Sequence, residues 1–126
     1  MLLEQMIPHN CLSFPKRRRL TRASEFERVK RGGTRERGKL LIIGSLHVAE
    51  AGPFRAGVVT PHQLGSAVVR NRIRRRLREI VRRHQNQMRN NLWIVLVAKS
   101  EAARASYAAL EDEWLRLAKR ASILAA

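Results

Sequence analysis

The sequence of 126 residues is poor in cysteine, in aromatic side chains and in long apolar runs. Its single cysteine, Cys11, makes no internal disulfide and provides no thiol cluster for a metal, so we expect a reducing environment. No apolar run approaches the roughly 20 residues that a membrane-spanning helix needs. The N-terminal stretch also lacks the basic region and apolar segment of a secretory leader. We therefore predict a cytoplasmic protein with no membrane partner.

Carboxylates are scarce, and this scarcity argues against a nuclease that catalyses through its own side chains. The chain has 10 Asp and Glu against 26 Lys and Arg. A metal-dependent nuclease needs several carboxylates that converge from different elements. Glu111, Asp112 and Glu113 are instead successive residues, whose side chains diverge on a helix. The four histidines are scattered along the chain without a spacing typical of metal ligands. We predict no catalytic residue and no metal site in the chain.

Positive charge is what the sequence has in excess, with a formal net charge of +16 at pH 7. Hydrophobic residues make up 44% of the chain, which is enough to form the core of one domain. Arginine outnumbers lysine, which favours bidentate contacts with phosphate and stacking on bases. This composition predicts a nucleic-acid-binding protein, with binding to an anionic membrane surface as the less favoured alternative.

The stretch from Ser66 to His84 predicts an arginine-rich amphipathic helix around which the chain is organised. Its apolar stripe consists of Val69, Ile73, Leu77, Ile80, Val81 and His84. One flank of the stripe carries Arg70, Arg74 and Arg78, and the other carries Arg72, Arg76 and Arg83. Ser66 is the expected N-cap. Like charges at this spacing repel one another unless a polyanion neutralises them, so we favour an RNA-binding helix over a merely solvated one. Arginines on two flanks also suit contact with two RNA molecules.

The remaining pattern predicts three strands and two more helices. A helix capped by Ser24 ends at the glycines 32 and 33. Residues 40–48 and 55–60 are predicted to form a hairpin through a Gly-Pro turn, and residues 92–98 a strand covered on both faces. A last helix spans residues 106–124, and residues 1–15 form a flexible extension of the domain 16–126. The order strand, helix, strand predicts a right-handed crossover by the general rule.

Three classes of nucleic-acid protein besides an RNA-enzyme subunit fit parts of this pattern. A ribosomal or general RNA-binding protein would share the charge. A sequence-reading DNA protein would need more varied side chains on its recognition helix and a preceding helix across a short turn. A protein-only nuclease would need the carboxylates that the chain lacks. The pattern therefore favours RNA binding without catalysis by the chain itself.

Three segments of the chain resemble the protein subunit of bacterial ribonuclease P, the ribonucleoprotein that removes 5′ leaders from precursor tRNA. The resemblance covers residues 14–124. The segments are Phe14-Pro15-Lys16 with Arg19-Leu20, Phe26 and Val29; then Gly65-Ser66-Ala67-Val68-Val69-Arg70-Asn71-Arg72-Ile73-Arg74-Arg75 with Arg78-Glu79; and the strand–helix ending from Leu92 onward.

The resemblance implies an α+β fold of order αβββαβα in a single domain, similar to the second domain of ribosomal protein S5. A mixed sheet would carry the central arginine-rich helix, and the βαβ crossover would be left-handed. The resemblance further implies a subunit of an endoribonuclease in which catalysis belongs to the RNA. The implied partners are the catalytic RNA and precursor tRNA, with no further protein partner. The implied cofactor is Mg²⁺, held mainly by the RNA.

Two sets of site residues follow from the resemblance and from the basic run that precedes it. The expected RNA contacts are Arg70, Asn71, Arg72, Arg74, Arg75, Arg78, Arg82, Lys16, Arg17 and Arg19. The expected residues of the cleft that holds the single-stranded leader are Phe26, Arg55, Thr60 and His62.

The chain also departs from the family pattern at several positions. Arg76 stands where an apolar residue is common, and Pro61-His62-Gln63 replaces a loop that commonly carries a lysine pair. Lys30 and Gly44 occupy positions where relatives offer aromatic rings to the leader. These departures imply less stacking on the leader, with the electrostatic attraction retained.

Overall fold

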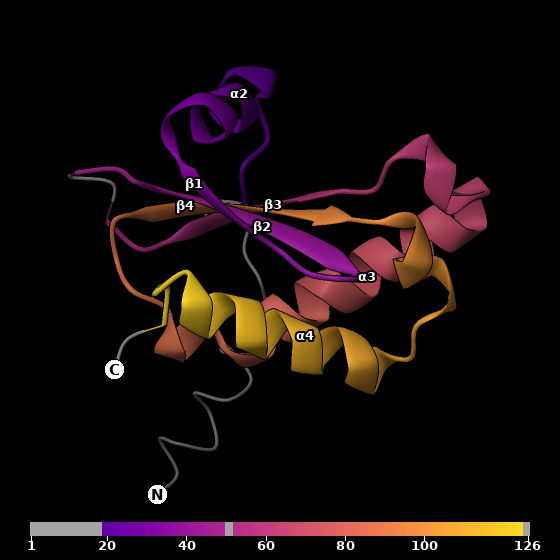
Figure 1. The fold of residues 1–126 in the computed structure, drawn as a ribbon. Helices are drawn as coiled ribbons and strands as arrows, with labels where there is room; N and C mark the ends of the chain where they lie inside the picture. The colour runs from indigo at the N-terminus through magenta and orange to yellow at the C-terminus, as the bar shows by residue number, and fades with distance from the viewer. Residues whose placement is uncertain (1–18, 50–51, 125–126) are drawn as a thin grey trace, which may run out of the picture.

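A computed structural model describes residues 19–49 and 52–124 of the chain, in which three α-helices pack on one four-stranded sheet (Figure 1). The predicted extension 1–15 lies outside the described residues. The elements are α2 (Ala23–Gly32), β1 (Thr34–Arg37), β2 (Leu41–His47), β3 (Arg55–Val59), η2 (His62–Leu64), α3 (Ala67–Arg83), η3 (Gln85–Gln87), β4 (Leu92–Ala98), η4 (Ser100–Arg104) and α4 (Tyr107–Arg120). This is the αβββαβα order that the resemblance implied. No helix of the described part has the length and apolar character to span a membrane.

The strand order β1-β2-β4-β3 shows that the predicted hairpin of residues 40–48 and 55–60 was wrong. Strand β4 lies between the two strands, antiparallel to β2 and parallel to β3. Strand β4 is the most apolar of the strands, so it takes this inner position, where burying both of its faces removes few polar side chains from water. Strand β1, which the apolar pattern missed, pairs with β2 as a polar edge strand.

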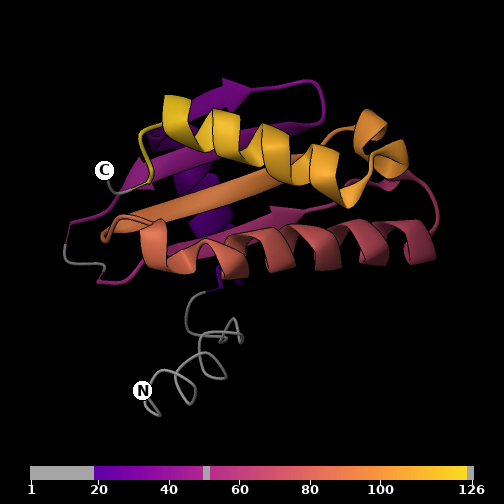
Figure 2. The same ribbon diagram turned by 90° about the horizontal axis from the view of Figure 1, so that it is seen from below.

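The crossover from β3 through α3 to β4 is left-handed, as the resemblance implied and against the general rule. Figure 2 shows the molecule from the side on which α3 and α4 lie. In this view β3 and β4 point to the right, α3 returns to the left in front of the sheet, and β4 lies above β3. The right-handed expectation from the strand–helix–strand order was therefore wrong.

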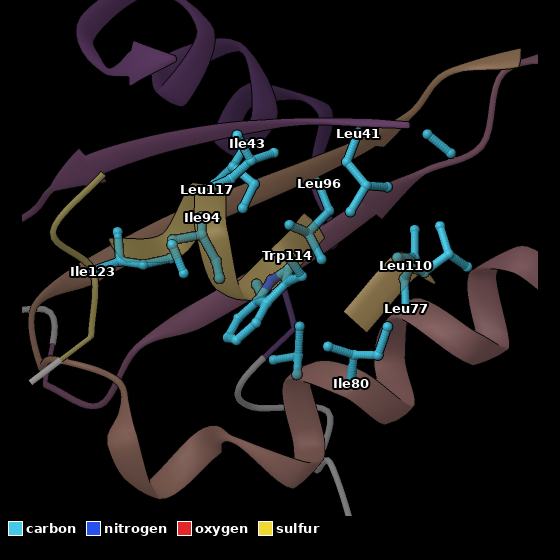
Figure 3. Close-up of a cluster of buried hydrophobic side chains, with 14 of the residues drawn as sticks. Leu41, Ile43, Leu77, Ile80, Ile94, Leu96, Leu110, Trp114, Leu117 and Ile123 are labelled. Carbon is cyan, nitrogen blue, oxygen red and sulfur yellow. The ribbon is translucent and has the colours of Figure 1, made fainter. Parts of the chain in front are cut away.

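Helices α3 and α4 cover one face of the sheet and enclose the main core (Figures 1 and 3). The predicted stripe of α3 is confirmed, because Ile73, Leu77 and Ile80 are fully buried. Ser66 caps α3 as predicted, with its hydroxyl accepting from the Val69 amide at 3.3 Å. On α4, Trp114 is also fully buried. The core thus fixes α3 by its apolar stripe and leaves its charged flanks outside.

At its C-terminal end, α3 is joined to α4 by a polar contact. His84 stacks on Trp114 with a centroid separation of 5.3 Å, and its Nε2 lies 2.9 Å from a carboxylate oxygen of Glu111. His84 therefore lies at the edge of the core, where the stripe placed it.

Helix α2 covers part of the opposite face of the sheet. Its Phe26 ring lies against Gly57 of β3, where an added Cβ would be only 2.4 Å from the ring. Val29 is buried beside Gly44 of β2, where an added Cβ would lie 3.5 Å from its Cγ1, an ordinary contact distance. The predicted N-cap, Ser24, is inside the helix; the cap residue is Arg22.

A buried carboxylate ties the turn between β1 and β2 to α4. Oε2 of Glu113 accepts hydrogen bonds from the amides of Leu40 and Leu41 at 2.6 and 2.7 Å. Its side chain is only 3% exposed, and a Cβ at Gly38 would lie 2.4 Å from the same oxygen. Glu113 therefore bonds to backbone amides, whereas Asp112 is exposed and lies near Arg116.

Replacing Glu113 by alanine should lower the free energy of unfolding by about 2–4 kcal/mol, because two amide donors lose their acceptor. Urea denaturation of the Glu113→Ala variant measures this loss. The matched control is Glu101→Ala, at an exposed position of η4, which should change stability by less than about 0.5 kcal/mol. Equal stabilities of the two variants would contradict the assignment.

Candidate nucleic-acid interface

The arginines of α3 divide between two flanks, as the sequence predicted. With the stripe docked on the core, one flank faces η4 and α4, and the other faces the end of β3 and the segment at Arg19. Because the helix contributes a single acid, Glu79, most of these charges have no counter-charge within the helix. The surroundings of each flank decide which arginines are left for a ligand.

The flank towards η4 is largely occupied by contacts within the protein. Arg72 and Arg76 donate to the carbonyl oxygens of Ala103 and Ala105 at 3.3 and 3.1 Å. Arg83 lies 3.5 Å from the Glu111 carboxylate. Arg76 is half-buried and so contributes to the docking of α3 on η4. This flank has a structural role, which weakens the hypothesis that α3 contacts one RNA with each flank.

The flank towards β3 forms a cluster of cations, which we call the β3-side cluster: Arg19, Arg70, Arg74 and Arg78. Burial, and then the charges of Arg19 and Arg74, lower the pKa of the Arg78 guanidinium. The Nε of Arg70 is buried and has no hydrogen-bond partner within the described residues. Arg74 donates to neutral oxygens, Oδ1 of Asn71 at 2.6 Å and the hydroxyl of Thr60. A phosphate group here would gain several charge-assisted hydrogen bonds and relieve the repulsion.

Three further predicted contacts on α3 differ in their surroundings. Arg75 and Asn71 are exposed and point away from the core. Arg82 forms an ion pair with Glu79, and this hydrogen bond lowers the pKa of the Glu79 carboxyl. Arg82 is thus partly neutralised, so it offers less to RNA than Arg75 does. Lys16 and Arg17 lie outside the described residues.

The four residues predicted to line the leader cleft do not lie together. Phe26 and Arg55 share the face of the sheet that α2 covers. Thr60 is buried on the other side, where its hydroxyl meets Arg74. His62 is exposed in η2, just before α3 begins. The structure therefore joins Thr60 to the β3-side cluster and keeps Phe26 and Arg55 on the α2 face.

Sequence reasoning missed Trp93, which lies on the α2 face at the start of β4. The guanidinium carbons of Arg28 and Arg55 are 5.3 and 5.4 Å from its ring centroid. The alternation of the strand could have revealed this, since Trp93 is two residues from Val95 and on the opposite face from Ile94. Beyond Trp93, the half-buried Val59 and Val97 continue the same apolar face.

Comparison with known proteins gives consistent matches over most of the chain. A family model described as Ribonuclease P matches residues 14–122. The ribonuclease P protein component of Syntrophomonas wolfei is 36% identical over 110 residues, which cover 87% of this chain and 92% of the relative. That of Acidothermus cellulolyticus is 42% identical over 108 residues, covering 84% and 89%. A solved structure of the Staphylococcus aureus RNase P protein is similar in fold, with a TM-score of 0.79 at 23% identity, covering 84% of this chain and 96% of that one.

Replacing Arg70 and Arg78 by glutamine should weaken binding to a ribonuclease P RNA and flatten its salt dependence. Each lost phosphate contact lowers the slope of log K against log salt by about 0.7–0.9, so the double variant should lose roughly 1.4–1.8. Binding titrations at several salt concentrations measure the slope.

The matched control is the double variant Arg76→Gln, Arg83→Gln, which removes the same charge from the other flank. Because these two residues bond within the protein, the control should mainly lower thermal stability and change the slope by less than about 0.5. Equal changes in slope for both double variants would refute the division between the flanks.

Proposed function

The chain belongs to the family of bacterial ribonuclease P protein components, and from this premise we propose how it assists the catalytic RNA. Family membership makes it a subunit of an endoribonuclease and a partner of ribonuclease P RNA. Our proposal is that the β3-side cluster binds phosphates of that RNA and that the α2 face binds the single-stranded 5′ leader of precursor tRNA. The protein would then hold two polyanions side by side while the RNA performs the cleavage.

The observation that carries the proposal is the excess of cations in the β3-side cluster. Burial of the α3 stripe holds the backbone of Arg70, Arg74 and Arg78 at fixed spacing, and burial, followed by the charges of Arg19 and Arg74, lowers the pKa of the Arg78 guanidinium. Counterions condensed on RNA are released when such a cluster takes their place, which favours binding. The fixed spacing of these positions along α3 suits the phosphate backbone of a folded RNA, because the helix itself needs no rearrangement to meet it.

The α2 face supports the assignment of the leader. Next to the cations, this face offers the Phe26 ring and the half-buried valines Val59 and Val97. A single-stranded segment can lay its bases on such an apolar surface and leave its phosphates towards the arginines. Lys30 and Gly44 provide no rings, and the ring of Trp93 is already in contact with the guanidinium groups of Arg28 and Arg55, so we propose that Phe26 is the main stacking residue of the cleft.

We further propose that the Mg²⁺ ions of the reaction are held mainly by the RNA. Within the described residues, no three His, Cys, Asp or Glu side chains are grouped as metal ligands. The protein's contribution would be electrostatic. By neutralising phosphates where the two RNAs meet, it would lower the magnesium concentration that the ribonucleoprotein needs.

The test is cleavage of precursor tRNA by a bacterial ribonuclease P RNA at low magnesium, with and without the purified chain. We expect the chain to stimulate cleavage, and we expect the assembled ribonucleoprotein to bind precursor more tightly than mature tRNA. Absence of stimulation, together with equal affinities for the two tRNAs, would favour a general RNA-binding protein instead.

Replacing Phe26 by leucine should reduce the preference for precursor by about 1 kcal/mol, because a stacked base is lost while most of the packing on Gly57 is kept. Equilibrium binding of precursor and mature tRNA to the ribonucleoprotein measures this preference. The salt slope of precursor binding should be the same in this variant as in the unaltered protein, since no charge is removed. A preference equal to that of the unaltered protein would exclude Phe26 as a stacking residue.

A further inference from the structure

The guanidinium of Arg55 is surrounded by protein groups on the α2 face. Its Nη1 donates to Oε2 of Glu25 at 2.7 Å, and its Nη2 donates to the carbonyl oxygen of Arg19 at 2.9 Å. Its central carbon lies 5.4 Å from the ring centroid of Trp93. The side chain is only 25% exposed. These contacts occupy both terminal nitrogens and neutralise the charge. The remaining nitrogen, Nε, has no hydrogen-bond partner within the described residues but is buried, so little of Arg55 is accessible to a phosphate.

Glu25, on the other side of the ion pair, controls the start of α2. Its second oxygen, Oε1, accepts from the amides of Thr21 and Arg22 at 2.9 and 3.0 Å. Burial acts to raise the pKa of Glu25, but the hydrogen bonds from Arg22, Thr21 and Arg55 outweigh it and lower the pKa. One carboxylate thus bonds both to the first turn of α2 and, through Arg55, to strand β3.

This ion pair lies beside the residue that forms the wall of the leader cleft. Phe26 follows Glu25 directly, and its ring lies on Gly57, two residues after Arg55 on the same face of β3. At the far end of α2, Val29 contacts Gly44 of β2. Helix α2 is therefore held by the apolar contacts of Phe26 and Val29, by Arg28 over the ring of Trp93, and by the Glu25–Arg55 ion pair, which lies next to Phe26.

We propose that Arg55 and Glu25 are positioning residues for leader binding. Their ion pair holds α2 against β3 and thereby sets the position in which the Phe26 ring contacts the leader. Arg55 thus acts through α2, without touching RNA. The proposal rests on the assignment of the α2 face to the leader. It also gives Arg55, which was predicted as a residue of the leader cleft, an indirect role there.

The two roles of Arg55 predict opposite effects for the variant Glu25→Gln. If Arg55 contacted RNA, removing its neutralising acid would strengthen binding of precursor tRNA, because the surface would become more positive. If the pair positions α2, the same variant weakens the preference for the leader. Glutamine is a suitable replacement because Glu and Gln serve equally at this position of a helix cap, so the cap is kept and only the ion pair is lost.

The experiment compares Glu25→Gln, Arg55→Gln, the double variant and Glu27→Gln, each assembled with ribonuclease P RNA. Glu27 is the matched control, since it is an exposed acid of the same helix and its replacement changes the charge equally. The measured quantity is the ratio of affinities for precursor and mature tRNA, with the salt slope of precursor binding. We expect the ratio to fall roughly three- to tenfold in both single variants, as for loss of a charge-assisted hydrogen bond.

The double variant should lower the ratio of affinities no further than either single variant does, because both residues act through the same ion pair. The salt slope of Arg55→Gln should stay within about 0.5 of the unaltered protein, whereas loss of a phosphate contact would lower it by about 0.7–0.9. Glu27→Gln should keep the full ratio. Tighter precursor binding by Glu25→Gln, or additive effects of opposite sign in the double variant, would overturn the proposal.

Amide hydrogen exchange of α2 in the four proteins gives a readout that does not depend on RNA. Exchange should speed up in Glu25→Gln and Arg55→Gln and stay unchanged in Glu27→Gln, because only the first two release the helix. If the unaltered ribonucleoprotein shows no preference for precursor, the proposed leader site fails, while faster exchange still supports the ion pair as the anchor of α2. Unchanged exchange in both single variants overturns the positioning role itself.

Discussion

Repulsion among arginines that are held in place by a buried apolar stripe is the constraint on which the rest of the structure depends. Helix α3 carries eight arginines among its 17 residues and only one acid, Glu79. Burial of Ile73, Leu77, Ile80 and Val81 fixes the helix on the sheet, so the charges have no freedom to move apart. The hydrophobic contribution of such side chains, roughly 1.5–3 kcal/mol each, outweighs the repulsion between exposed charges. The fold therefore stores unfavourable charge density that a polyanion relieves.

The protein distributes this charge unevenly over its surface. On the η4 side, carbonyl oxygens accept hydrogen bonds from Arg72 and Arg76, and Arg83 lies in an ion pair with Glu111, so these contacts tie α3 to its neighbours. On the β3 side, Arg74 meets neutral oxygens, and Arg78 lies near the further charges of Arg19 and Arg74. The positive charge of α3 that faces no carboxylate is consequently concentrated on its β3 side. Family membership makes the chain a subunit of an endoribonuclease, and the contribution we propose for it is this uneven distribution of charge.

The spacing of apolar residues along the sequence predicted the helices well. It could not predict which strands pair with one another in the sheet. The stripe of α3 and its Ser66 cap follow from residue spacing, which local periodicity determines. The position of β4 between β2 and β3 depends on contacts far apart in sequence, so a Gly-Pro turn suggested a hairpin that does not form. The left-handed crossover came only from family resemblance. Within the candidate site, the two arginine flanks of α3 could be predicted from the sequence. The face of the sheet on which Thr60 lies and the partners of Arg55 could not, because they depend on how the helices pack on the sheet.

The most direct test of the account is site-specific cross-linking in the assembled ribonucleoprotein. A benzophenone would be attached to a cysteine introduced at Asn71 on α3 or at Ala108 on α4, both exposed, with Cys11 replaced by serine. The account predicts that the probe at residue 71 cross-links efficiently to the ribonuclease P RNA and that the probe at residue 108 does not. Cross-links from residue 108 alone would show that the RNA binds elsewhere and would contradict the role of the arginine helix.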